Sequence, residues 1–300
     1  MTRTLVTGAA GFTGHYVSQM LAERGHEVHG LIHAPEHAPA PGVTHTHQAD
    51  LADLKSLERI VDQVRPDHVV HLAAVSFVAH SDIDEMYRTN VVGTRQLLES
   101  LSRSAGPLTS VLLASSANIY GNSREGVLDE TVPPSPVNDY GVSKVAMEYM
   151  ARLYMSRLPI VVVRPFNYTG RGQNESFLLP KIVAHARKRA SVIELGNLDV
   201  ARDFSDVRTV AETYVKLLST SGAVGEVFNV CSGRAVSLRS VLEIVGRLSG
   251  HPLEVKVNPD LVRANEVRSL CGSSAKLQGI IGPPLDAIPL EETLSWMLQD

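Results

Sequence analysis

Short apolar runs alternate with amphipathic segments over the first two thirds of the chain. The runs are rich in β-branched and aliphatic residues and predict strands at Thr4–Thr7, Glu27–Ile32, His68–Leu72, Ser110–Ser115 and Ile160–Val163. Between them, apolar residues recur at helical spacing, each set marking one buried face: Val17, Met20 and Leu21; Leu54, Leu57, Val61 and Val64; Val91, Leu97, Leu98 and Leu101. This alternation predicts an α/β fold with a doubly wound parallel sheet covered by helices.

The regular alternation loosens after Arg164, where prolines and glycines interrupt it. Later strands are expected near Val192 and Glu254, and a periodic helix is expected over Asp206–Leu218. The short apolar run Val227–Val230 predicts that the chain returns to the first sheet. We therefore expect residues 1–165, with about 205–231, to form one domain. Residues 166–204 and 232–300 are expected to form a smaller C-terminal α/β lobe.

Composition narrows the class of protein without naming a function. The 300 residues are 44% hydrophobic and carry a formal net charge of -4, which gives no reason to expect a nucleic-acid partner. The two cysteines have no metal-ligand or disulfide spacing, so no metal is expected. No secretory signal or apolar run long enough for a membrane span is found. These features predict a soluble cytoplasmic protein with no membrane partner.

A glycine-rich turn follows the first predicted strand. Thr7 leads into Gly8-Ala9-Ala10-Gly11-Phe12-Thr13-Gly14 and then into a predicted helix. Glycines at this place let backbone N–H groups approach a pyrophosphate, and the helix N-terminus supplies partial positive charge. The position and spacing predict a Rossmann-type dinucleotide site, with cofactor contacts at Gly8, Gly11, Phe12, Thr13 and Gly14.

The end of the second predicted strand bears on the choice of cofactor. It reads Leu31-Ile32-His33, with no carboxylate to hold the adenosine ribose hydroxyls of NAD. NADP(H) is therefore favoured, with His33 as a candidate contact for its 2′-phosphate, and use of NAD(H) is left open. Asp50-Leu51 is a candidate contact for the adenine, although an aspartate before a helix is also a common N-cap.

Tyr140 and Lys144 are four residues apart at the start of a predicted helix, which places the phenol and the ammonium on one face. An ammonium beside a phenol is expected to lower the phenol pKa from about 10 toward working pH, as a proton shuttle requires. Upstream, Ser116 follows the predicted strand that ends at Ser115, at the edge where open α/β sheets bind ligands. Ser116 is the candidate that binds a substrate carbonyl, and Ser115 is expected to satisfy local backbone.

With these motifs, His71-Leu72-Ala73-Ala74 and Ile119-Tyr120-Gly121, nearly the whole chain resembles the extended short-chain dehydrogenase/reductase family. The resemblance implies Ser116, Tyr140 and Lys144 as catalytic residues. It further implies cofactor contacts at Leu72, Ala73, Ala74, Tyr140, Lys144 and Pro165, and a substrate contact at Ser76. Asn90 matches a structural asparagine that joins helix to strand and orders a water.

Members of the family usually form homodimers through a four-helix interface. The segments Ile83–Leu101 and Tyr140–Tyr154 are the candidates for that interface in this chain, although the same apolar faces are also suited to internal packing.

Three further stretches resemble the branch of the family that acts on GDP-mannose derivatives, nearest to the GDP-4-keto-6-deoxy-D-mannose reductases. They are residues 164–173, residues 195–204 and residues 263–267. The resemblance implies a GDP-linked sugar substrate held by Asn167, Asn197, Arg202, Arg263 and Glu266. Arginine forks suit a diphosphate because they bind its oxygens bidentately without losing charge. Ion pairs of Arg202 with Asp203 or Asp206, and of Arg263 with Glu266, are the alternatives, and Asp206 itself is expected to be structural.

The residues after Ser116 bear on the reaction. The related 4,6-dehydratases carry an acidic residue immediately beyond this serine, whereas this chain has Ala117-Asn118. A neutral pair disfavours dehydration. We therefore predict reduction of the C4 keto group of GDP-4-keto-6-deoxy-D-mannose to a GDP-6-deoxyhexose of the rhamnose or talose type. The alternatives are a 4-epimerase with bound NAD, then a GDP-mannose 4,6-dehydratase. A non-catalytic protein on this fold is disfavoured because Tyr140 and Lys144 are both present.

Overall fold

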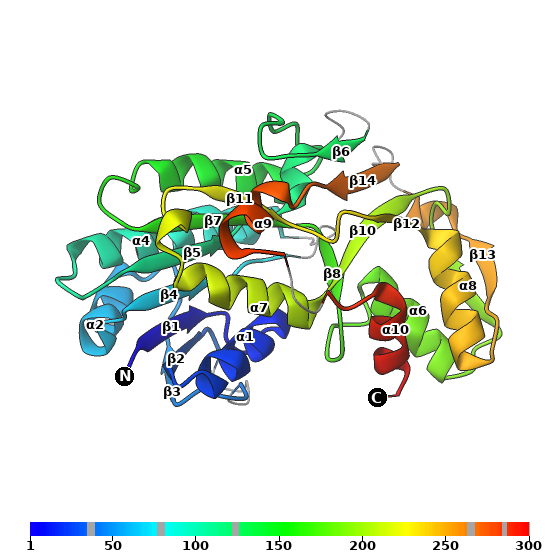
Figure 1. Cartoon of the computed structure of the whole chain (residues 1–300), viewed down its shortest axis with the longest axis horizontal. Helices are drawn as coiled ribbons and strands as arrows, with labels where there is room; N and C mark the ends of the chain where they lie inside the picture. Colours follow the sequence, from blue (N-terminus) through cyan, green and yellow to red (C-terminus); the bar gives the residue numbers. More distant parts are fainter. Residues whose placement is uncertain (35–39, 77–81, 122–125, 263–267, 284–286, 300) are drawn as a thin grey trace.

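A seven-stranded, entirely parallel sheet occupies one half of the molecule, with strand order β11-β7-β5-β4-β1-β2-β3 (Figure 1). The computed structural model describes residues 1–34, 40–76, 82–121, 126–262, 268–283 and 287–299. The strands are β1 (Arg3–Thr7), β2 (Glu27–Ile32), β3 (His45–Gln48), β4 (His68–His71), β5 (Ser110–Ala114), β7 (Ile160–Pro165) and β11 (Val227–Val230). The chain winds outward from β1 in one direction and then from β4 in the other, which confirms the predicted doubly wound fold.

Helices cover both faces of this sheet, because alternate residues of each strand point to opposite sides. The helices α1 (Phe12–Glu23) and α7 (Val207–Leu218) pack on one face against residues such as Val6 and Val161. On the other face, α2 (Leu54–Val64), α4 (Thr94–Arg103) and α5 (Asp139–Arg152) pack against residues such as Leu5 and Leu113. A short α3 (Ile83–Tyr87) and a π-helical turn η1 (Arg88–Gly93) lead directly into α4.

The second half of the molecule is a smaller lobe, at the right of Figure 1. Its sheet has the order β12 (Ala235–Ser237), β10 (Ala201–Asp206), β14 (Ser269–Gly272) and β6 (Val127–Leu128), and β8 (Asn167–Thr169) also pairs with β10. The predicted strands near Val192 and Glu254 are present as β9 (Val192–Leu195) and β13 (Glu254–Val257), and they pair with each other. Helices α6 (Leu178–Arg187), α8 (Leu238–Ser249) and α10 (Leu290–Leu298) enclose this lobe's own apolar core.

Two elements cross the predicted domain boundaries. The strand β6 pairs with β14 of the second lobe, and Leu277 of α9 (Ala275–Ile281) packs into the core of the first sheet. The division into residues 1–165 with 205–231, and 166–204 with 232–300, stays a prediction. The short 3-10 helices are η2 (Ala117–Tyr120), η3 (Ser221–Ala223) and η4 (Pro259–Leu261).

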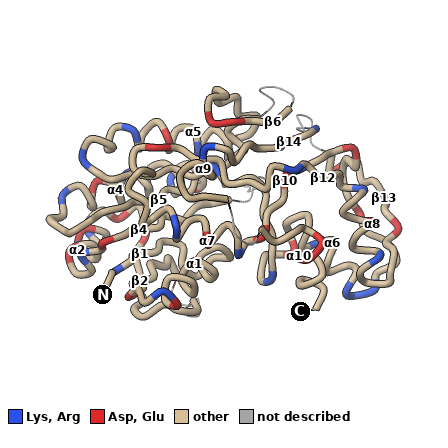
Figure 2. Tube along the Cα trace, viewed as in Figure 1, with Lys and Arg blue, Asp and Glu red and all other residues tan. Residues whose placement is uncertain are grey.

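Charged residues of both signs are interspersed along the described trace (Figure 2), in keeping with a formal net charge of -4. Every helix within the described residues is too short or too polar to span a lipid bilayer.

A buried ion pair fixes α5 on the sheet. The guanidinium of Arg164 on β7 donates to both carboxylate oxygens of Glu148 on α5, at 2.9 and 2.7 Å, and both side chains are 4% exposed. Arg164 also donates to the Tyr120 hydroxyl at 2.9 Å, and that hydroxyl donates to Asn229 Oδ1 at 2.7 Å. Because both charges are paired and hydrogen-bonded, this network couples α5, η2, β7 and β11 in one arrangement.

Removing one partner of this pair leaves a buried, uncompensated charge. We expect Arg164→Met to lower the free energy of unfolding by about 3–5 kcal/mol. The double variant Arg164→Met/Glu148→Leu is expected to recover most of that loss, because neither charge then remains buried. Urea unfolding of the wild type and the three variants, including Glu148→Leu, measures the coupling. Additive losses in the double variant would contradict the proposed pairing.

Candidate active site

The glycine turn after β1 forms a tight cradle at the N-terminus of α1. Gly8 has a φ of 69°, and a Cβ placed on it would lie 2.8 Å from the backbone N of Ala73. A Cβ on Gly14 would lie 2.2 Å from Gly8 O, so the first turn of α1 packs directly on the preceding turn. Larger residues at these positions would displace the backbone. The cradle therefore fits a dinucleotide pyrophosphate, whose approach requires bare backbone at a helix N-terminus.

Ser116 lies immediately beyond β5 and is 6% exposed. Its hydroxyl oxygen accepts from the backbone N–H of Asn118 and from the Asn118 side-chain amide, both at 3.1 Å. A hydroxyl has two acceptor lone pairs and one O–H. Because Asn118 occupies both acceptor positions, the remaining role of the Ser116 hydroxyl is to donate, and it forms a side-chain hydrogen bond with Tyr140.

Tyr140 and Lys144 come from the first two turns of α5, and the predicted shared face is confirmed. Tyr140 is 8% exposed and Lys144 5%. The ammonium of Lys144 lies 5.9 Å from the centre of the Tyr140 ring and donates to the carbonyl of Ala114, at the end of β5, at 2.8 Å. The structure therefore brings all three predicted catalytic side chains together at the carboxyl edge of the central strands.

The pKa values of this pair differ from the sequence-based expectation. Burial raises the pKa of Tyr140 well above its usual range, and the nearby Tyr168 raises it further, against a lowering by the Ser116 hydrogen bond. Burial also lowers the pKa of Lys144 to about 8, although Glu148 opposes this shift. The predicted lowering of the phenol pKa by Lys144 is therefore wrong for this arrangement, because desolvation outweighs the neighbouring ammonium. The phenol is held protonated, in the form that donates a proton.

Close packing at the start of α5 brings Tyr140 to Ser116. Asn138 is the N-cap, and its side chain accepts from the backbone N–H of Gly141 at 2.8 Å. A Cβ on Gly141 would lie 2.8 Å from the carbonyl oxygen of Asn118, so only glycine permits this approach.

Asn90 supports the same helix from the other side. Its amide donates to Ser143 Oγ on α5 at 3.0 Å and exchanges hydrogen bonds with the backbone of Val75 at 2.9 and 3.1 Å. Asn90 is 1% exposed and lies in η1, so it joins that turn to the loop after β4 and to α5. This is the structural position that the resemblance implied; its predicted contact with the cofactor stays a prediction.

A cleft of about 940 Å³ runs from the glycine turn, past the three catalytic side chains, to the smaller lobe. Most of the predicted site residues line it: Gly8, Gly11, Phe12, Thr13, Gly14, Leu72, Ala73, Ala74, Ser76, Ser116, Tyr140, Lys144, Pro165, Asn167, Asn197 and Arg202.

The candidate substrate residues in this cleft are polar. Asn167 has a buried side-chain amide nitrogen with no hydrogen-bond partner among the described residues. Arg202 donates to the carbonyls of Ala201 and Arg268, at 2.9 and 3.3 Å. Asp206 instead pairs with Arg208 at 2.7 Å and accepts from Thr293 at 2.8 Å, which confirms its structural role. A buried donor and a guanidinium on one cleft wall suit a phosphorylated ligand.

Asp203 has a structural role of its own. Its carboxylate accepts from the hydroxyl and backbone N–H of Ser232, at 2.6 and 2.8 Å, and from Gly233 N at 2.9 Å. It is fully buried, so these bonds fasten β10 to the loop after β11.

The predicted contacts for the adenosine half of the cofactor lie outside the cleft lining. The Asp50 carboxylate accepts from Ala52 N at 2.8 Å, and Asp53 rather than Asp50 is the N-cap of α2. Leu51 packs in the core beneath α2, and the carbonyl of His33 accepts from Gln48 at 3.2 Å. The roles of His33, Asp50 and Leu51 toward a cofactor stay predictions. Arg263 and Glu266 lie outside the described residues.

Tyr168 is a site residue that the sequence did not single out. Its hydroxyl and that of Thr13 are hydrogen-bonded at 2.8 Å, and its ring stacks on Phe12 with centroids 6.1 Å apart. Tyr168 lies on β8 of the smaller lobe, so it joins that lobe to the glycine turn and faces the same cleft. Its position in the chain, beside Asn167, was the only available sequence indication.

Comparison with known proteins places these features in a family context. The NAD dependent epimerase/dehydratase family model matches residues 4–231. The GDP-6-deoxy-D-talose 4-dehydrogenase of Aggregatibacter actinomycetemcomitans is 35% identical over 281 residues, covering 93% of this chain and 91% of that protein. The GDP-6-deoxy-D-mannose reductase of Pseudomonas aeruginosa is 32% identical over 309 residues, covering 99% and 96%.

Solved structures give the same arrangement. A protein of Burkholderia cenocepacia J2315, named only as a candidate epimerase, is 49% identical with a TM-score of 0.91, covering 99% of this chain and 97% of that one. RMD from Pseudomonas aeruginosa, complexed with NADPH, is 30% identical with a TM-score of 0.84, covering 100% and 98%.

The buried Lys144 makes folding stability depend on pH. Its pKa falls from 10.5 to about 8 in the folded protein, so between these values the unfolded chain binds more protons. The wild-type free energy of unfolding should therefore rise, relative to that of Lys144→Met, as the pH increases from about 8 to 10. Urea unfolding of both proteins at several pH values measures the difference. A difference that stays constant over this range would contradict a desolvated ammonium at this position.

Proposed function

The chain belongs to the NAD dependent epimerase/dehydratase family and is a nucleotide-sugar-modifying oxidoreductase of the extended short-chain dehydrogenase/reductase type, and on this premise we propose that it reduces a nucleotide-linked 4-keto-6-deoxyhexose. The proposed substrate is GDP-4-keto-6-deoxy-D-mannose, and the product is a GDP-6-deoxyhexose of the rhamnose or talose type. One observation carries the proposal: Asn118 occupies both acceptor positions of Ser116, which leaves two hydroxyls, Ser116 and Tyr140, as donors at one point of the cleft.

These donors suit carbonyl reduction. A substrate carbonyl oxygen placed between Ser116 and Tyr140 accepts hydrogen bonds from both, and its C4 becomes more electrophilic. When bound in the glycine cradle, NAD(P)H supplies the hydride that C4 receives. Tyr140 transfers its proton to the developing alkoxide, so one hydride and one proton convert the ketone to the alcohol. The Lys144 ammonium stabilises the phenolate that remains and is placed to hold the nicotinamide ribose.

The same geometry disfavours dehydration. Expelling the C6 hydroxyl requires a proton donor and a base near C5 and C6. In this chain the side chain beyond Ser116 is Asn118, whose amide is used to orient the serine. An amide neither donates a proton to a leaving group nor accepts one from carbon at neutral pH.

A 4-epimerase with retained NAD is the second candidate function, because it would use the same three side chains. It is favoured by the 49% identity to a candidate epimerase. The two functions differ in one respect: a reductase consumes one NAD(P)H per product, and an epimerase consumes none.

NADP(H) is the proposed cofactor, with NAD(H) as the alternative. The support is the end of β2, where His33 stands in place of the carboxylate that holds the ribose hydroxyls of NAD. An NADPH complex among the structural relatives agrees with this preference.

We also propose a homodimer in a reducing, cytoplasmic setting. Exposed apolar side chains gather on α5 and η1, with Leu153 at 73%, Tyr149 at 54% and Val92 at 44% exposed, as expected of a helical interface. The described cysteines, Cys231 and Cys271, are both free thiols.

The decisive assay mixes purified protein, NADPH and freshly prepared GDP-4-keto-6-deoxy-D-mannose and follows the loss of NADPH absorbance. We expect stoichiometric oxidation by the wild type. Tyr140→Phe should lower kcat by roughly 10²–10⁴-fold because it removes the proton donor and little else. No oxidation with this substrate, or equal rates for the variant, would defeat the proposal.

The orienting role of Asn118 gives a separate prediction. In Asn118→Asp, a carboxylate replaces the amide, so the Ser116 hydroxyl donates to it instead of to the substrate. Loss of one such donor should lower kcat roughly 10²-fold, with little change in KM for the nucleotide sugar. Asn118→Ser, which offers a hydroxyl in place of the amide, is the matched control and should lose less. A change in KM alone would show that Asn118 acts only in binding.

A further inference from the structure

A second cluster of titratable side chains lies at the opposite end of the first sheet from the cleft. Glu27 and His29 lie on β2, and His45 and His47 lie on the neighbouring edge strand β3. His29 and His45 are paired in register, so these alternate residues share one side of the sheet. None of the four lines the cleft.

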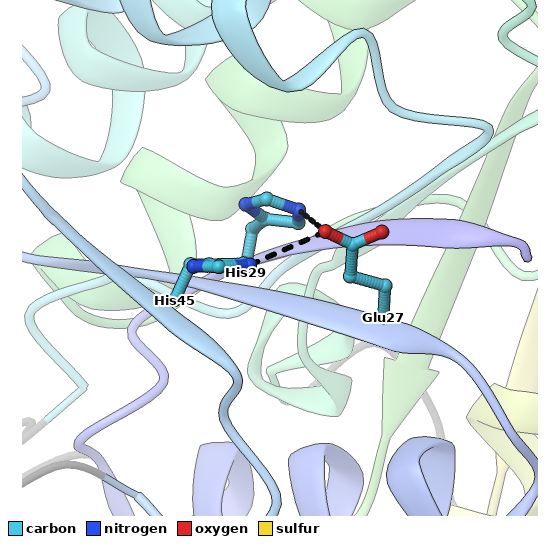
Figure 3. Close-up of side chains that lie close together, drawn as sticks. All are labelled: Glu27, His29 and His45. Atoms are coloured by element: carbon cyan, nitrogen blue, oxygen red, sulfur yellow. Dashed lines mark ion pairs between the residues drawn. The ribbon is translucent and has the colours of Figure 1, made fainter.

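Three of these side chains converge on one point, as Figure 3 shows. Glu27 Oε1 lies 3.3 Å from His29 Nε2 and 3.3 Å from His45 Nε2. One ligand atom from each of the three lies within 4.8 Å of the other two. Ligands bound tetrahedrally at 2.0–2.1 Å from a zinc ion are about 3.3 Å apart. Two of the three separations have this value already, and the half-exposed His45 has freedom to adjust the third.

His29 is the central member of the cluster. It is 7% exposed, and its Nε2 makes no hydrogen bond within the described residues, although it lies close to Glu27. A buried nitrogen without a hydrogen bond normally carries an energetic cost. A cation between His29 and Glu27 would satisfy this nitrogen and the carboxylate together.

The other ring nitrogen of His29 has the partner that a metal ligand requires. His29 Nδ1 lies 3.0 Å from His47 Nε2. With Nε2 on a metal, Nδ1 carries the proton and donates it to His47, which fixes the ring orientation. Burial, followed by the proximity of His47, lowers the pKa of His29, so its imidazole is neutral and able to coordinate at neutral pH.

We propose that Glu27, His29 and His45 form a binding site for a divalent transition-metal ion of the zinc type, with His47 as the hydrogen-bonded support of His29. Two imidazoles and one carboxylate suit zinc, and a water completes the fourth position. The ion would join the edge strand β3 to β2. These strands lead into His33 and Asp50, so the site stabilises the edge of the sheet that precedes the proposed adenosine-binding loops.

The alternative is a simple ion pair between Glu27 and a protonated His45. Zinc binding separates the two, and it tests the site independently of the proposed enzyme activity. Tag-free protein is stripped with a chelator, and Zn²⁺ affinity is measured by competition with a chromophoric chelator. Co²⁺ is used in parallel, because its absorbance reports tetrahedral coordination.

We expect one Zn²⁺ per chain in the wild type and in His185→Gln, a control histidine on α6 whose ring bonds the carbonyl of Lys181. Glu27→Gln and His45→Gln should each weaken binding by at least about 100-fold, whereas His47→Phe, which removes only the support, should weaken it roughly 10- to 100-fold. Zn²⁺ should raise the Tm of the wild type and not that of His45→Gln.

Equal affinity in the wild type and in Glu27→Gln/His45→Gln, or the absence of stoichiometric Zn²⁺ binding by the wild type, would overturn the site. His45 is 53% exposed at its side chain, so its replacement is not expected to impair folding.

Discussion

The close approach of α5 to the end of β5 is the constraint on which the active site depends. Gly141 permits it, because any Cβ there would lie 2.8 Å from the carbonyl of Asn118. The buried pair of Arg164 and Glu148 holds the same helix two turns later. With α5 fixed at both points, Tyr140 has little choice but to meet Ser116. The chemistry of the site is therefore set by packing as much as by the identity of its polar residues.

The two lobes contribute different parts of one cleft. The first sheet presents bare backbone at its glycine turn and three hydroxyl or ammonium groups at the ends of its central strands. The smaller lobe presents Asn167 and Arg202, from two paired strands. Tyr168, on the same strand as Asn167, bonds Thr13 across the cleft and so fixes the distance between the two walls. A substrate with a sugar between a ketone and a diphosphate matches this division.

Much of the fold and the catalytic centre could be predicted from sequence because they rest on local patterns: apolar runs for the central strands, glycine spacing for the turn, and helical spacing for Tyr140 and Lys144. The edge strand β3 was missed because its residues are polar and mostly exposed. Desolvation, which reverses the expected pKa shift of Tyr140, depends on the whole fold. The convergence of Glu27, His29 and His45 required the register of two strands. Alternate histidines in a polar strand were the only sequence indication of it.

The central claim is that this site transfers a hydride from the cofactor to C4 of a sugar and releases a reduced product. Nicotinamide cofactor carrying deuterium at its transferable position tests this claim most directly, with the product examined by NMR. The account predicts one deuterium at C4 of the GDP-6-deoxyhexose and one oxidised cofactor per product. A product without deuterium at C4, formed while the cofactor stays reduced, would contradict it and indicate epimerisation instead.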